Sequence, residues 1–168
     1  GESALALFQS YKDIYQIAGA YVTIGKYYNY HQLYNKALEA LTKALDVVNK
    51  HHKTYYPDHH NTPDDLVLYD KDDAGDYTEI NWIKDDVFTV PEWIARIREQ
   101  LSVVYAGLNN KEASDYNRNI YLDILDLVRQ DKEAESRFES LKQEEKFINT
   151  LLFLLFFVIL CLSIIFIW

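Results

Sequence analysis

The sequence predicts an all-α protein of helical hairpins, interrupted by a long acidic insert and followed by a single C-terminal transmembrane helix. Three observations support this fold class: apolar residues at spacings of three and four, a charge-rich stretch in the middle, and an uncharged run at the end. About half of the 168 residues are apolar, which is enough for a packed core. The expected segments are a hairpin with a preceding helix at 1–50, the acidic insert at 51–90, a second hairpin at 91–130, a membrane-proximal helix at 131–146 and the transmembrane helix at 147–168.

The most specific pattern lies in the first hairpin. Small residues alternate there with large ones at helical spacing, as antiparallel helices need where they approach closely. This pattern resembles the tetratricopeptide repeat, which implies a first helix near 17–31 and a second near 34–50. The repeat's usual proline after the second helix is replaced by Asn49, and residues 2–16 fit the second helix of a preceding repeat. The matching positions are Tyr21, Ile24, Gly25, Tyr28, Tyr34, Ala37, Leu41 and Ala44.

The second hairpin is expected to begin at Pro91, a residue suited to a first helical turn, with Thr89 as its cap. A turn at Asn109 and Asn110 should separate its two helices. Two interpretations of this segment remain open, a degenerate repeat and a plain helical hairpin. Both give an all-α domain, and the apolar stripe of the first helix consists of Trp93, Ile94, Ile97, Leu101, Val104, Tyr105 and Leu108.

The insert carries most of the chain's charge. From Asp58 to Glu92 there are 11 acidic residues against two lysines, a balance of nine negative charges that equals the formal net charge of the whole chain, −9. Such a surface argues against nucleic-acid binding, which needs positive charge facing phosphate. A cationic partner, a metal ion and simple solvation remain as interpretations. Part of the insert, including Ile80 and Trp82, is apolar enough that we expect it to pack over the helices.

Two motifs in the insert have metal-ligand chemistry but the wrong pattern. Residues 70–81 begin like a calcium loop, yet Ala74 and Asn81 occupy the fifth and twelfth positions, where such a loop needs oxygen ligands and a bidentate glutamate. The paired histidines do not have the spacing of a structural zinc site. The sequence therefore predicts neither a metal nor a cofactor, although it contains His51, His52, His59 and His60.

The C-terminal run from Leu151 to Trp168 contains no charged residue. About 18 such residues predict a transmembrane helix, and a buried core helix is the alternative. The chain contains no Met and starts Gly1-Glu2-Ser3, so we expect it to be a fragment of a longer protein.

The helix before this run has a seven-residue periodicity, and no Pro or Gly occurs between Asn109 and Trp168. One continuous helix is therefore expected. A homodimer through residues 131–146 is one interpretation, and a single amphipathic helix is the other, because half of the companion positions are polar. The seven-residue series is Leu127, Ala134, Leu141, Ile148, Leu155 and Leu162.

Residues 91–108 and 114–146, PEWIARIREQLSVVYAGL and SDYNRNIYLDILDLVRQDKEAESRFESLKQEEK, carry a closer resemblance. They are similar to the extracytoplasmic sensor region of bacterial membrane-bound histidine kinases with tetratricopeptide-like input domains. The resemblance implies a single-pass protein of the cell membrane, with its folded domain outside the cytoplasm and a helix that carries conformational change to a cytoplasmic kinase. We therefore expect a sensor domain that binds a protein or peptide and passes the signal through the transmembrane helix. A scaffold protein anchored by its tail and a membrane-tethered transcription regulator are the alternatives.

No catalytic motif is present in the sequence. It contains no Gly-rich phosphate loop, no HExxH, no GxSxG, and its one cysteine lies in the apolar run. We therefore expect no catalytic site within these residues, and a docking surface on the concave face of the first hairpin, around Tyr21, Tyr28 and Tyr34.

Overall fold

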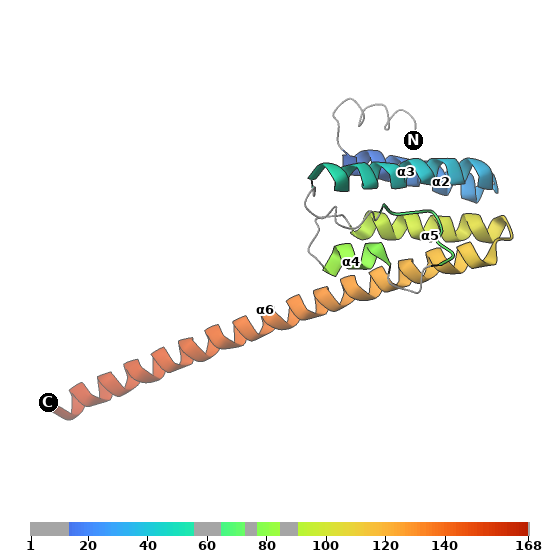
Figure 1. Ribbon diagram of the computed structural model, residues 1–168. Coiled ribbons are helices and arrows are strands. Elements are labelled where there is room, and N and C mark those ends of the chain that lie inside the picture. Colours follow the sequence, from blue (N-terminus) through green and yellow to red (C-terminus); the bar gives the residue numbers. More distant parts are fainter. Residues whose placement is uncertain (1–13, 56–64, 73–76, 85–90, 168) are drawn as a thin grey trace. The chain divides into compact units, whose positions relative to one another are not determined.

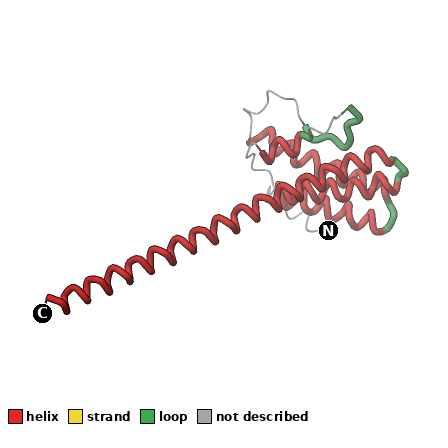
Figure 2. Tube along the Cα trace, turned by 90° about the horizontal axis from the view of Figure 1, so that it is seen from below, coloured by secondary structure: helices red, strands yellow, loops and turns green. Residues whose placement is uncertain are grey.

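The computed structural model describes residues 14–55, 65–72, 77–84 and 91–167, which contain five helices and, among these residues, no strand (Figures 1 and 2). The predicted all-α class is therefore confirmed. The chain divides into two units, 1–126 and 127–168. Residues 2–13 of the predicted helix over 2–16 lie outside the described residues, and so does the predicted cap Thr89. The helices are α2 (Ile14–Tyr30), α3 (Tyr34–Tyr55), α4 (Thr78–Lys84), α5 (Pro91–Gly107) and α6 (Lys111–Ile167).

Helices α2 and α3 form the predicted antiparallel hairpin (Figure 1). Helix α2 ends because Gln32 adopts a left-handed conformation, with φ 57°. The Leu33 N–H then donates to the Tyr28 carbonyl (2.9 Å) and the Gln32 N–H to the Asn29 carbonyl (2.9 Å). This is the Schellman arrangement, which satisfies carbonyls that the helix end would leave unpaired.

A glycine suits the left-handed position better than the glutamine present. Gln32→Gly is expected to stabilise the first unit by up to about 1 kcal/mol, because an L side chain is strained at this φ and glycine is not. Chemical denaturation of both forms measures the change. Gln32→Ala is the matched control, since alanine removes the side chain but keeps the strain; an equal gain from both substitutions would contradict the explanation.

Close helix contacts in the first unit occur at residues without a side chain. A Cβ atom at Gly25 would lie 2.8 Å from Cγ of Leu41 in α3, and one at Gly19 would lie 2.5 Å from the Trp93 indole of α5. Helix α5 therefore packs on the same hairpin. Four residues of the predicted apolar stripe are buried, Ile94, Ile97, Leu101 and Val104, whereas Trp93 and Tyr105 are partly exposed and Leu108 is exposed just beyond the helix. The core of the unit includes Ala37, Leu41, Ala44, Leu45, Ile94, Ile97, Leu101, Val104, Ile120 and Ile124, together with smaller residues of α2.

The predicted turn at Asn109 and Asn110 is confirmed. Asn109 has φ 59°, and the Asn110 N–H donates to the Tyr105 carbonyl (2.9 Å), which ends α5 in the same way as α2. The Asn110 side-chain oxygen then accepts the Ala113 N–H (3.1 Å) and caps α6. The Ser114 hydroxyl donates to the Ser102 carbonyl (2.8 Å), so the start of α6 is tied to α5.

The described parts of the insert pack on the helices, as expected. The Leu66 N–H donates to the Asn49 side-chain oxygen (2.8 Å), and the Asn49 amide donates back to the Leu66 carbonyl (2.9 Å). Trp82 of α4 is buried and stacks on His52 of α3, with ring centroids 3.8 Å apart. Asn49, which stands where the repeat has a proline, therefore anchors the insert, and α3 continues past it to Tyr55.

The end of the chain corrects one prediction. Helix α6 does run to Ile167, but no helix within the described residues holds a stretch long and apolar enough to cross a membrane, so the transmembrane helix at 147–168 is not supported. The described side chains of the apolar run cover Leu151–Phe157 and Ile159, with charged residues before them, whereas a span needs about 20 residues. The side chains of Val158 and of 160–168, Cys161 included, lie outside the described residues. The homodimer and the membrane location stay predictions.

Candidate functional site

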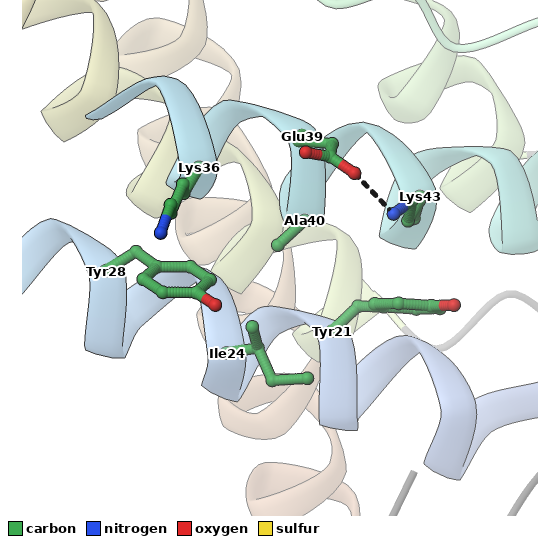
Figure 3. A pocket seen from close by; sticks show the side chains of 7 residues that line it. All are labelled: Tyr21, Ile24, Tyr28, Lys36, Glu39, Ala40 and Lys43. Carbon is green, nitrogen blue, oxygen red and sulfur yellow. Dashed lines mark hydrogen bonds and ion pairs between the residues drawn. The ribbon is translucent and has the colours of Figure 1, made fainter. Parts of the chain in front are cut away.

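A groove lies on the α2–α3 hairpin, and it is the candidate site (Figure 3). It is open to solvent and has a volume of about 340 Å³. Helix α2 supplies its aromatic and branched residues, and α3 supplies its charges and its one alanine. We call this hollow the α2–α3 groove; it is lined by Tyr21, Ile24, Tyr28, Lys36, Glu39, Ala40 and Lys43.

The groove follows from helical periodicity. Tyr21, Ile24 and Tyr28 are three and four residues apart on α2 and therefore project from one face of it. On α3, Lys36, Ala40 and neighbours at the same spacing project toward them. The opposite face of α2 holds Gly19, against which Trp93 of α5 packs, and the buried alanines other than Ala40 belong to the core. The hairpin thus has a packed side and an open side.

Charges in the α2–α3 groove are partly paired. The Lys43 ammonium lies 2.6 Å from the Glu39 carboxylate, one helical turn away, and both side chains are more than half exposed. Their hydrogen bond is the main cause that lowers the pKa of Glu39 and raises the pKa of Lys43. The Lys36 ammonium instead lies 5.8 Å from the centroid of the Tyr28 ring, a cation–π arrangement. Both ammonium groups therefore have a partner within the groove, Glu39 for Lys43 and the Tyr28 ring for Lys36.

The structure brings together two of the three tyrosines predicted to form the docking surface. Tyr21 and Tyr28 line the groove, but Tyr34 does not. A Cβ atom at Gly107 would lie 2.3 Å from the Tyr34 ring, which shows that this ring packs against the end of α5. Sequence reasoning missed the residues that α3 contributes, Lys36, Glu39, Ala40 and Lys43, although their spacing on the second helix of the hairpin could have placed them on one face.

A second polar cluster is buried where α4, α5 and α6 meet. Arg98 is 0% and Glu79 1% exposed; the Arg98 Nε donates to the Glu79 carboxylate (2.6 Å), and its Nη2 donates to the same oxygen. The Arg98 Nη1 donates to the Asn117 side-chain oxygen (2.8 Å), and the Asn117 amide donates to the Leu68 carbonyl (2.9 Å). Because the cluster is closed to solvent, it can hold the insert in place but cannot admit a substrate.

Histidines and carboxylates of the described residues do not gather into a metal site: no group of three or more of them, with cysteine included, could hold an ion there. Burial lowers the pKa of His51, and His52 packs on Trp82. Asp70 accepts the backbone N–H of Asp72 (2.9 Å) in a local turn. His59 and His60 and part of the calcium-like segment lie outside the described residues.

Comparison with known proteins identifies a family for this chain. Residues 11–168 match the model of a family described as a domain of unknown function (DUF5113). No curated protein and no solved structure matches the chain.

Proposed function

The chain belongs to the DUF5113 family, a family of unknown function, and we propose that it is the ligand-binding input domain of a signal-transduction protein, whose α2–α3 groove binds a protein or peptide. The observation that carries the proposal is the open groove itself. It combines aromatic, apolar and cationic side chains on one face of a hairpin whose other side is packed in the core. Tyrosines beside an apolar floor are typical of protein-binding surfaces.

The groove chemistry favours binding over catalysis. The Lys43 pKa is raised, so its amine stays protonated and cannot act as a nucleophile near neutral pH. The Glu39 pKa is lowered, so its carboxylate stays ionised and cannot donate a proton. Lys36 and the tyrosine hydroxyls offer hydrogen bonds and charge, which suit recognition of a ligand.

The signalling part of the proposal is supported by α6 and by the resemblance to sensor regions. Helix α6 begins at the Asn110 cap, contributes Asn117 to the buried cluster of the first unit, and continues as one helix to Ile167. Residues 91–108 and 114–146 are similar to the sensor region of histidine kinases. A binding event that alters the packing of the hairpins can therefore reach the start of α6.

Peptide selection on the whole chain tests the proposal. We expect a displayed library of random peptides, selected on the full chain in detergent, to yield binders whose affinity falls by about tenfold or more in the double variant Tyr21→Ala/Tyr28→Ala, because the variant removes two aromatic contacts of the groove. Fluorescence anisotropy with the selected peptides measures the loss.

Tyr30→Ala is the matched control, since this tyrosine is 84% exposed on the same helix but does not line the groove. Thermal unfolding followed by circular dichroism checks that all variants fold. Peptides that bind the double variant as tightly as the unchanged chain would refute the groove as the docking site.

A further inference from the structure

We propose that the partner of the α2–α3 groove is an amphipathic helix that carries two acidic side chains seven residues apart, one for Lys36 and one for Lys43, with apolar side chains between them. The inference rests on the proposed function and names the chemistry of its ligand. It follows from the spacing of the two lysines along α3, from the floor between them and from the local charge.

The spacing of the lysines favours a helical ligand. Seven residues of α3 cover about 10.5 Å and almost two full turns, so Lys36 and Lys43 project from nearly the same face. A ligand helix that lies along α3 repeats this spacing at its own positions i and i+7. An extended strand does not match it. Its side chains on one face recur about every 6.8 Å, so they lie about 7 or 14 Å apart and not about 10.5 Å.

The floor of the groove accepts apolar side chains at the middle of such a helix. Ile24 and Ala40 lie between Tyr21 and Tyr28 in Figure 3, and Ala40 is small and buried. Residues i+3 and i+4 of a ligand helix face the same side as i and i+7 and would rest on this floor. This is the helix-in-groove mode, in which a few apolar anchors supply most of the affinity.

Local charge in the groove is the opposite of the charge on the chain as a whole. Two lysines face one glutamate, a balance of one positive charge, whereas the whole chain has a formal net charge of −9. The Lys43–Glu39 pair is exposed and can be exchanged for a pair with a ligand carboxylate. Because the rest of the chain repels acidic ligands at long range, preference for them must come from short-range contact with these lysines.

Two designed peptides test the inference. The first is an alanine-rich helix with two glutamates seven residues apart and leucines three and four residues after the first glutamate; the second has lysines in place of the glutamates. We expect the glutamate peptide to bind the full chain about tenfold more tightly by fluorescence anisotropy. Lys36→Glu/Lys43→Glu should reverse the preference, and a peptide with its glutamates five residues apart should bind more weakly, because they then face different sides.

Lys26→Glu/Lys50→Glu is the matched control, because it changes the net charge equally at exposed lysines that do not line the groove. Equal binding of the two peptides, no binding of either, or an unchanged preference in Lys36→Glu/Lys43→Glu would overturn the helical acidic ligand. The proposed function would survive that result if the selected peptides still lost affinity in Tyr21→Ala/Tyr28→Ala. If they did not, the groove would be refuted as a docking site as well.

Discussion

Replacing Arg98 with Met is expected to destabilise the first unit by about 3–5 kcal/mol, because it leaves the Glu79 carboxylate buried without its ion-pair partner. Asn117 also loses a donor to its side-chain oxygen. Urea denaturation followed by circular dichroism measures the change in unfolding free energy. This is the largest effect we expect from a single substitution in the described residues.

The double variant Arg98→Met/Glu79→Leu separates this explanation from simple loss of packing. It replaces both charges with apolar side chains of similar size, so it should recover most of the stability lost in the single variant. Glu79→Leu alone should be strongly destabilising, since it strands the guanidinium. A double variant as unstable as the sum of the two single variants would show that the pair is not coupled.

Gly25→Leu is expected to cost about 1–3 kcal/mol of unfolding free energy, because the new side chain must enter space that Leu41 already fills. The gain in helix propensity over glycine, about 1 kcal/mol, offsets only part of this cost. Thermal or urea denaturation of the full chain in detergent measures it.

Lys26→Leu is the control for Gly25→Leu, because Lys26 is the next residue on α2 and is exposed. It makes the same apolar addition outside the core, so its effect should stay within about 0.5 kcal/mol. Equal destabilisation by the two substitutions would mean that the α2–α3 crossing does not depend on a small residue at position 25.

The first hairpin could be predicted because its packing depends on the spacing of small and large residues that are close in the sequence. The alternation of small and large residues around Gly25 and Leu41 indicates that two helices adjacent in the sequence approach each other closely. Helix ends were harder to predict: α3 runs to Tyr55 because Asn49 does not break it. The apolar C-terminal run shows that composition alone can mislead. It predicted a helix, which the structure confirms, and also a membrane span, which the described residues do not support.

Parts of the candidate site depended on contacts that no local pattern shows. The sequence predicts Tyr34 on the docking surface, but its ring packs against α5 at Gly107, a residue distant in the sequence that has no side chain to block the ring. Arg98 and Glu79 each look like ordinary surface charges in the sequence, and only the packing of α4 on α5 buries them together. Tyr21 and Tyr28 do line one groove, because they are seven residues apart on one helix and share a face of it. Their role in docking stays a prediction.

The close approaches of the three described glycines have a consequence for comparisons within the family. Each glycine lies against one large side chain of another helix, so a bulkier residue at a glycine position requires a smaller partner, and the two positions should change together between members. Lys36 and Lys43 do not pack in the core, so their identity should instead vary with the ligand. Covariation therefore distinguishes the positions that maintain the fold from those that follow a binding partner; the packing pairs are Gly19 with Trp93, Gly25 with Leu41, and Gly107 with Tyr34.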